Sequence, residues 1–250
     1  MKALITGASS GLGADMARVL VEEGYEVILV ARRKGKLEKL AKELGDNAKI
    51  IVKDISSTYN CVELYNEVKN EDIDILINNA GFGLCGFFNE TNLDKELDMI
   101  DLNIKSLHTL TKLFLKDFVK KDQGYILNVG SSAGFMPGPL MTTYYSTKNY
   151  VVSFTSALYE ELRRLGSNVS ISCLCPGPVD TEFNKVARVK FAVKAMESNK
   201  VARYAIKKMF DEKLIIVPGF GMKAALFFSK FMSRKSLLKM TYKIQEKKTK

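Results

Sequence analysis

The chain has 250 residues, of which 46% are hydrophobic and 26% are charged, and its formal net charge is +10. This length suits one α/β domain, and we expect residues 1–250 to form a single domain. No apolar run approaches the roughly 20 residues that cross a bilayer, and no signal-peptide pattern precedes the first strand-like run. We therefore expect a cytoplasmic protein. The four cysteines have no zinc-type spacing and no partnering histidines, so no metal site is expected.

The positive charge is concentrated in the last quarter of the chain. Residues 1–184 carry 20 Lys and Arg against 24 Asp and Glu, whereas residues 185–250 carry 18 against 4. Residues 219–250 are predicted to be a basic amphipathic extension. Such a helix can make a peripheral membrane contact, here through residues 221–250, but it can equally contact another subunit or cover the sheet. No nucleic-acid recognition motif accompanies the charge, so no nucleic-acid partner is expected.

Apolar strand-like runs alternate with amphipathic helical runs along the chain. Strands are predicted at Lys2–Thr6, Glu26–Ala31, Lys49–Lys53, Ile73–Ile77, Gly124–Val129, Val169–Leu174 and Leu214–Val217. Helices are predicted at 12–23, 35–44, 59–69, 94–120, 143–165 and 200–210. Continuous apolar strands between amphipathic helices indicate a parallel sheet covered on both faces, which is a doubly wound α/β fold. Ligands of such folds bind beyond the carboxyl ends of the strands.

A glycine-rich turn, Thr6–Gly13, separates the first predicted strand from the first predicted helix. Gly7 permits a tight turn, Gly11 lets the backbone approach a phosphate, and Gly13 allows close packing of the helix. The free N–H groups and the positive dipole of the helix N-terminus then favour a pyrophosphate. The strand before the turn and the helix after it are the context that a dinucleotide site requires.

Two arginines, Arg32 and Arg33, follow the second predicted strand, where an acidic residue would favour NAD by bonding the adenosine ribose. The planar fork of arginine suits bidentate recognition of a phosphate. The sequence therefore predicts NADP(H) as the cofactor, with Arg32 favoured for the 2′-phosphate and Ser10 as a helper.

Tyr144 and Lys148 lie four residues apart in the helix predicted over 143–165, so they share one face. A phenol with a pKa near 10 must be lowered by roughly two to three units to act as a general acid or base at neutral pH. A nearby ammonium group favours the phenolate. Tyr145 meets Asn149 four residues later instead of a cation. Y-x-x-x-K spacing alone is common by chance; taken together with the other motifs of the chain, it makes Tyr144 and Lys148 the predicted proton-transfer pair.

Seven motifs between residues 6 and 181 occur in the order and spacing of the short-chain dehydrogenase/reductase family, and the chain resembles its single-domain branch of about 250 residues. They are the Thr6–Gly13 turn, Asp54, Asn78–Gly81, Asn103, Ser131, Tyr144 with Lys148, and Pro176–Thr181. The resemblance implies a Rossmann-type sheet of about seven strands. It also implies an oxidoreductase that moves a hydride between the nicotinamide and a carbonyl or alcohol. The last quarter of the chain carries no comparable motif.

The resemblance also assigns roles to individual residues. Ser131 would hydrogen-bond the substrate oxygen, Lys148 would hold the nicotinamide ribose, and Asn103 would hold a water that links Lys148 to solvent. Gly130 stands where many relatives carry another serine. The residues expected around the cofactor are Gly7, Ser9, Ser10, Gly11, Leu12, Gly13, Arg32, Arg33, Asp54, Ile55, Asn79, Ala80, Gly81, Tyr144, Lys148, Pro176, Gly177, Val179 and Thr181.

Several apolar side chains are predicted to form an apolar slot for a ketone, aldehyde or acyl substrate. They are Leu84, Phe87, Phe135, Met136, Met141, Phe183 and Phe191. Residues 183–200 correspond to a lid in relatives. The resemblance further implies a homodimer or homotetramer assembled through the two longest helices. The alternative hypothesis is a catalytically silent dinucleotide-binding regulator or scaffold; such proteins usually lose the tyrosine or the lysine, and this chain retains both.

Overall fold

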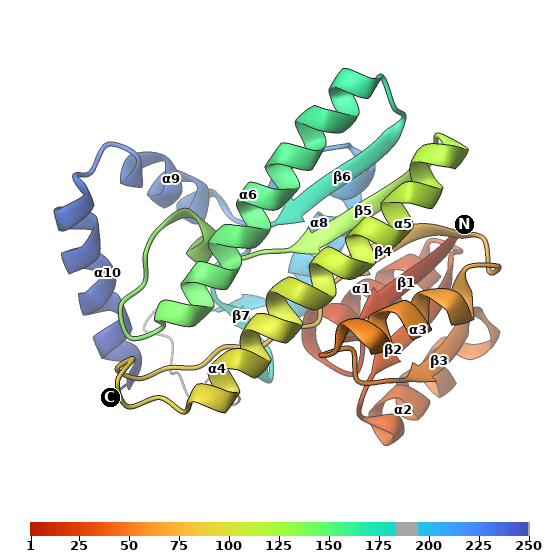
Figure 1. The fold of residues 1–250 in the computed structure, drawn as a ribbon, viewed down its shortest axis with the longest axis horizontal. Helices are drawn as coiled ribbons and strands as arrows, with labels where there is room; N and C mark the ends of the chain where they lie inside the picture. Colours follow the sequence, from red (N-terminus) through yellow and green to blue (C-terminus); the bar gives the residue numbers. More distant parts are fainter. Residues whose placement is uncertain (184–194, 250) are drawn as a thin grey trace.

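The computed structural model describes residues 1–183 and 195–249 and contains a seven-stranded sheet in the order β3-β2-β1-β4-β5-β6-β9 (Figure 1). The strands are β1 (Lys2–Thr6), β2 (Glu26–Ala31), β3 (Ala48–Val52), β4 (Ile73–Asn78), β5 (Gly124–Val129), β6 (Val169–Leu174) and β9 (Ile215–Ile216). Every neighbouring pair is parallel. The predicted doubly wound fold is thereby confirmed. A separate short pair joins β7 (Val179–Asp180) to β8 (Met196–Glu197).

Helices cover both faces of the sheet. They are α1 (Gly11–Glu22), α2 (Lys34–Leu44), α3 (Thr58–Val68), α4 (Leu93–Ile100), α5 (Leu107–Lys121), α6 (Thr142–Leu165), α8 (Ser198–Phe210), α9 (Phe220–Ser229) and α10 (Arg234–Thr249), with short 3₁₀ turns η1 (Gly45–Asn47) and η3 (Ser132–Phe135). One apolar cluster joins α1, α2 and α8 to the sheet, and a second joins α3, α5 and α6 to its other face (Figure 1).

The two clusters follow from the side-chain alternation along a strand. In β1, Ala3 and Ile5 belong to the cluster under α1, whereas Leu4 belongs to the cluster under α3. All three side chains are fully buried. Because the strands are parallel, their carboxyl ends lie at one edge of the sheet, and the loops that follow them meet there.

The helix predicted over 94–120 is present but is interrupted by a π-helical turn, η2 (Asp101–Ser106), between α4 and α5. The Ser106 hydroxyl donates to the Ile55 carbonyl and, at 2.9 Å, to the Asp101 carbonyl. Such turns concentrate at functional sites, and this one contains Asn103.

The basic extension folds as two helices, α9 and α10, at the end of the molecule away from β3 (Figure 1). Leu226 of α9 and Leu237 of α10 are buried. Within residues 1–183 and 195–249, no helix is long and apolar enough to cross a membrane.

Candidate active site

The glycine-rich turn packs directly against the loop that follows β4. The Thr6 hydroxyl accepts hydrogen bonds from the Asn79 and Ala80 backbone N–H groups at 3.0 and 3.1 Å. A Cβ on Gly7 would lie 2.8 Å from the Ala80 Cα, and one on Gly13 would lie 2.5 Å from the Asn79 Nδ2. Larger residues would therefore separate the turn from β4. The N-cap of α1 is Ser10, whose side chain forms no capping hydrogen bond, so the first N–H groups of α1 are available to an anion.

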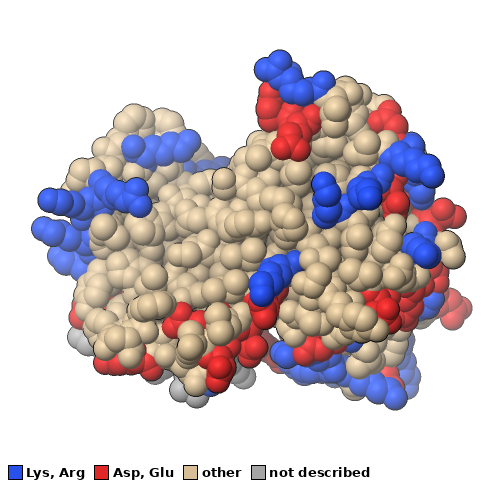
Figure 2. Space-filling view, in the orientation of Figure 1, with Lys and Arg blue, Asp and Glu red and all other residues tan. Residues whose placement is uncertain are grey.

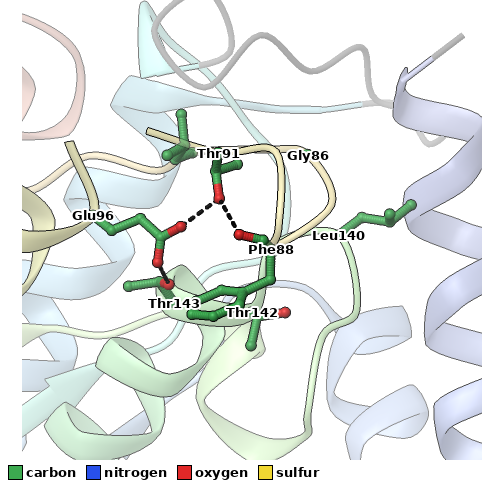
Figure 3. Close-up of a pocket in the computed structure, with 8 residues that line it drawn as sticks. Gly86, Phe88, Thr91, Glu96, Leu140, Thr142 and Thr143 are labelled. Carbon is green, nitrogen blue, oxygen red and sulfur yellow. Dashed lines mark hydrogen bonds between the residues drawn. The ribbon is translucent and has the colours of Figure 1, made fainter. Parts of the chain in front are cut away.

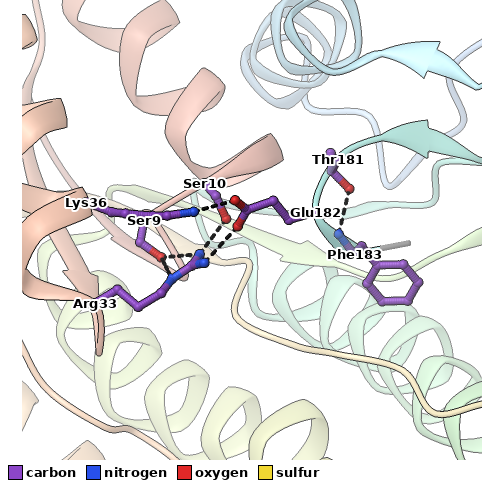
Figure 4. Close-up of polar contacts among 7 residues, drawn as sticks. All are labelled: Ser9, Ser10, Arg33, Lys36, Thr181, Glu182 and Phe183. Carbon is purple, nitrogen blue, oxygen red and sulfur yellow. Dashed lines mark hydrogen bonds and ion pairs between the residues drawn. The ribbon is translucent and has the colours of Figure 1, made fainter. Parts of the chain in front are cut away.

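Arg33 reaches from the start of α2 to the glycine-rich turn (Figure 4). Its Nε and Nη2 donate to the Ser9 hydroxyl at 3.1 and 2.8 Å, and Nη2 donates to the Ser10 hydroxyl at 2.6 Å. Its Nη1 lies 2.7 Å from the Glu182 carboxylate, which also contacts Lys36. The Lys36 ammonium first, and then the Arg33 guanidinium, lower the pKa of Glu182 to about 2. Two cations thus converge on the Glu182 carboxylate, and one of them, Arg33, also binds two hydroxyls of the turn beside the predicted phosphate site.

Arg32 lies farther from the turn than Arg33 does. Its Nη1 is 3.5 Å from the Asp54 carboxylate, and its side chain is 68% exposed. Asp54 also accepts a hydrogen bond from the Ser56 N–H at 3.0 Å, and Ile55 is buried. The sequence argument favoured Arg32 over Arg33 for a phosphate, but the structure brings Arg33 to the serines of the turn.

Tyr144 and Lys148 share the inner face of α6, and both side chains are more than 90% buried. The Lys148 Nζ donates to the Val129 carbonyl at 2.8 Å and lies 5.9 Å from the centre of the Tyr144 ring. Burial lowers the pKa of Lys148 to about 8. Burial raises the pKa of Tyr144 to about 12, against a smaller lowering by the Ser131 side chain. The lowered phenol pKa expected for catalysis is therefore not produced by these side chains alone.

Ser131 follows β5 directly and is the N-cap of η3, where its hydroxyl accepts from the Ala133 N–H at 3.1 Å. The preceding residue, Gly130, packs against two buried thiols. A Cβ there would lie 2.9 Å from the Cys173 Sγ and 3.3 Å from the Cys175 Sγ. A serine at position 130 would thus require these thiols to move.

Asn103 is buried in the π-helical turn and joins three parts of the site. Its Nδ2 donates to the Phe82 carbonyl at 3.0 Å and to the Thr147 hydroxyl at 3.1 Å, and its Oδ1 accepts from the Phe82 N–H at 3.1 Å. A Cβ on Gly81 would lie 2.8 Å from this Oδ1 and 3.6 Å from the Lys148 Nζ. Asn103 and Lys148 therefore face the same small space beside Gly81.

The segment Pro176–Thr181 closes the site above β6. The Pro176 carbonyl accepts from the Ser132 N–H at 2.9 Å. Thr181 lies against the glycine-rich turn, since a Cβ on Gly11 would be 3.0 Å from its Cγ2. Val179, in β7, is buried. The predicted phosphate-binding turn and the Pro176–Thr181 segment, which is also predicted to border the cofactor, thus meet.

An apolar cluster surrounds Tyr144. Four of the predicted slot residues belong to it: Leu84, Met136, Met141 and Phe183. The Phe183 ring lies 5.4 Å from the Tyr144 ring. Two predictions were wrong: Phe87 is about half exposed, and Phe135 packs in a different cluster, with α9. Phe191, and the part of the predicted lid over 184–194, fall outside the described residues.

A small, shallow hollow lined by apolar and polar residues lies next to the start of α6 (Figure 3). Its residues are Leu84, Gly86, Phe88, Thr91, Glu96, Leu140, Thr142 and Thr143. The buried Glu96 carboxylate accepts from the Thr91 hydroxyl and, at 2.6 Å, from the Thr143 hydroxyl. Glu96 therefore fixes the turn of α6 that carries Tyr144.

Sequence reasoning missed Glu182, Lys36 and Thr147. Glu182 contacts Arg33 across 149 positions of sequence, and no periodic pattern signals such a contact. Among the described residues, no group of three or more His, Cys, Asp or Glu side chains is arranged to hold a metal ion.

The parallel sheet, the glycine-rich turn at its carboxyl edge and the helix after that turn define a dinucleotide-binding fold of the Rossmann type. Residues 1–191 match the family model described as short chain dehydrogenase. The chain therefore belongs to the short-chain dehydrogenase/reductase family of oxidoreductases.

Curated and solved relatives agree with this assignment. The chain is 32% identical over 194 residues to the human very-long-chain 3-oxoacyl-CoA reductase, a match that covers 74% of this chain but only 62% of the human protein. It is 33% identical over 185 residues to an uncharacterized oxidoreductase of Staphylococcus epidermidis, of which the match covers 80%. A short-chain dehydrogenase of Sphingobium yanoikuyae in complex with NADPH superposes with a TM-score of 0.83 at 28% identity, covering 92% of this chain and 93% of that one.

Proposed function

We propose that residues 1–250 form one catalytic domain, an NADP(H)-dependent oxidoreductase that interconverts a carbonyl and an alcohol. The observation that carries this proposal is that Tyr144 and Lys148 pack against the loop after β4, since Cβ atoms on Gly83 and Gly81 would lie 3.3 Å from the Tyr144 Cδ2 and 3.6 Å from the Lys148 Nζ. The glycine-rich turn packs against the start of the same loop. Tyr144 is buried at the end of an apolar cluster, Lys148 lies one helical turn away, and Ser131 faces the phenol. A regulator would have no need of a buried proton donor with a buried cation beside it.

The cofactor supplies the hydride when it is bound, and the chain handles the proton. In the reducing direction, the Tyr144 hydroxyl donates its proton to the substrate oxygen, which the Ser131 hydroxyl also holds by donating a hydrogen bond. Lys148 uses one N–H on the Val129 carbonyl, so its other two N–H groups serve the nicotinamide ribose and the phenolate. Asn103 positions a water that returns a proton through Lys148.

The residues around the turn fit a phosphorylated dinucleotide. At Gly7 and Gly13 there is no room for a side chain between the turn and Asn79–Ala80. Without side chains at these positions, the backbone of the turn can approach a pyrophosphate. Arg33, with Arg32 beside it, provides the positive charge for the adenosine 2′-phosphate. In this proposal, Ile55 borders the adenine, Gly81 the ribose and Val179 the nicotinamide. Leu12, at the start of α1, also borders the cofactor.

Glu182 competes with that phosphate for Arg33 and Lys36, which yields a prediction. Glu182→Gln should tighten NADPH binding about two- to five-fold, because an exposed ion pair contributes up to about 1 kcal/mol. Arg33→Ala should weaken NADPH binding about ten-fold or more, the scale of a charged hydrogen bond. Binding of NADH, measured by the same fluorescence titration, should change less than about two-fold in both variants. Arg32→Ala is the matched comparison. An equal change in NADH binding would contradict this assignment.

The substrate is proposed to be apolar, because Leu84, Met136, Met141 and Phe183 surround the Tyr144 ring. The test follows NADPH consumption with aldehydes, ketones, steroids and 3-oxoacyl thioesters, and with NADH in parallel. Consumption that prefers NADPH is expected. Tight NADPH binding with no consumption on any of these substrates would favour the silent regulator instead.

We also propose that the chain forms a homodimer or homotetramer through α5 and α6. On the outer side of these helices, the His108 ring stacks 4.9 Å from Phe154 and its Nδ1 lies 2.7 Å from the Tyr150 hydroxyl. Long helices that carry aromatic residues on the surface are suited to pair with a second copy.

A further inference from the structure

Helix α9 carries apolar residues on two opposite sides, and only one side is packed. Successive helical residues are about 100° apart, which places Met222, Leu226 and Ser229 on one side. Leu226 and Ser229 are buried, and Met222 covers Gly177, where a Cβ would lie 2.5 Å from its Cε. This side therefore joins α9 to the segment above the active site.

The opposite side carries Phe220, Phe227 and Phe228, and Phe231 in the turn after α9 continues it; these four residues are called the phenylalanine face. These side chains are 86, 55, 66 and 75% exposed, respectively. The Phe227 ring lies 5.6 Å from Phe228 and 5.3 Å from Phe231, so three of the rings form one continuous apolar patch. A soluble surface rarely leaves so many aromatic rings together in water, and such patches mark interaction sites.

Positive charge surrounds the phenylalanine face. From residue 219 to 249, the chain has eight Lys and Arg and one acidic residue, Glu246. Six of the basic side chains are exposed: Lys223, Lys230, Arg234, Lys235, Lys239 and Lys243. Figure 2 shows Lys and Arg gathered over the part of the surface that α9 and α10 form, at the left of the view.

The combination of aromatic rings and positive charge distinguishes between two possible partners of this face, a second copy of the chain and a membrane. A second copy that packed the same face in a two-fold dimer would oppose two strongly basic surfaces, and like charges across an interface cost free energy. An anionic bilayer instead places phosphates beside the lysines and accepts the rings between its headgroups. We propose that α9 and the start of α10 bind the surface of an anionic membrane, with the phenylalanine face inserted.

The helices that carry this surface pack with their other sides against the proposed catalytic site, so the inference extends the proposed function. Met222 covers the Pro176–Gly177 turn, and Gln245 of α10 donates a hydrogen bond to the Tyr145 hydroxyl. Membrane binding therefore brings the apolar cluster around Tyr144 close to the lipid. That position suits an apolar carbonyl substrate that partitions into a bilayer.

Vesicle flotation with the full chain tests the proposal. Wild-type protein should bind vesicles with about 30% phosphatidylserine at least ten-fold better than pure phosphatidylcholine vesicles, and about 0.5 M NaCl should weaken this binding. Phe227→Ser combined with Phe231→Ser should reduce binding about ten-fold. Tyr59→Ser is the matched control, since Tyr59 is 71% exposed on α3, at the end of the molecule opposite α9 (Figure 1), and it should bind like wild type.

Three results would overturn the proposal: no flotation of the wild type, unchanged flotation of the double variant, or equal losses in the double variant and the control. Sedimentation in the absence of lipid adds a further arm. If the wild type is an oligomer, the double variant is a monomer and neither binds vesicles, the phenylalanine face is instead the contact with a second copy. Flotation does not depend on turnover, so Tyr144→Phe should float like wild type even if the proposed reaction is wrong. Circular dichroism of both variants checks their folding.

Discussion

Replacing Tyr144 by phenylalanine is expected to lower kcat about a thousand-fold, within the range attributed to a positioned general acid. The substitution removes only the hydroxyl, so the ring keeps its contacts with Phe183 and Tyr145. NADPH binding should change little, because the phosphate contacts proposed for Arg33 lie at the other end of the site. The measurement is steady-state NADPH consumption with the best carbonyl substrate.

The neighbouring tyrosine supplies the control for this result. Tyr145 is also buried, but its hydroxyl accepts a hydrogen bond from Gln245. Tyr145→Phe therefore removes a phenol from the same helix without removing the proposed proton donor, and turnover should stay within about five-fold of wild type, the scale of one lost neutral hydrogen bond. Comparable losses in the two variants would mean that the hydroxyls act through packing rather than through proton transfer.

Lys148 is expected to set the alkaline limit of carbonyl reduction. Its pKa is lowered to about 8 by burial, so its ammonium charge is present below this pH and is lost as the pH rises through it. The pKa of Tyr144 is raised to about 12, so the phenol stays protonated over the same range. The kcat in the reducing direction should therefore fall above about pH 8, approaching ten-fold per pH unit.

Two substitutions separate the charge of Lys148 from its shape. Lys148→Met should lower kcat at least about a hundred-fold at neutral pH, because it removes both the cation and its hydrogen bonds. Lys148→Arg keeps a cation that does not titrate in this range, so whatever activity remains should lack the fall above pH 8. The same fall in the arginine variant would assign the titration to another group.

The sheet and the ends of its strands were predictable because their signals are local. The apolar runs at β1, β4 and β5 identify strands, and the glycine spacing after β1 identifies a turn with its helix. Tyr144 and Lys148 could be paired because helical geometry places residues four apart on one face. Their predicted proximity is confirmed by the shared position on α6.

Other features depend on contacts that no local pattern encodes. Arg32 and Arg33 are adjacent, and the choice between them rests on how the chain turns from β2 into α2, which directs Arg33 toward Ser9. The interruption at Asp101–Ser106 rests on the Ser106 contact with Ile55. In α9, the sequence has apolar residues on both sides, and the packed side depends on tertiary contacts of Met222 and Leu226.

The most direct test of the proposed activity uses NADPH that carries deuterium at both C4 positions of the dihydronicotinamide, so that transfer from either face labels the product. The protein is incubated with this cofactor and with the best carbonyl substrate, and the product is analysed by mass spectrometry. We expect an alcohol with one deuterium on the former carbonyl carbon, formed about a thousand-fold more slowly by Tyr144→Phe. A product without deuterium would contradict hydride transfer from the cofactor, and an equal rate of labelled-product formation by Tyr144→Phe would contradict Tyr144 as the proton donor.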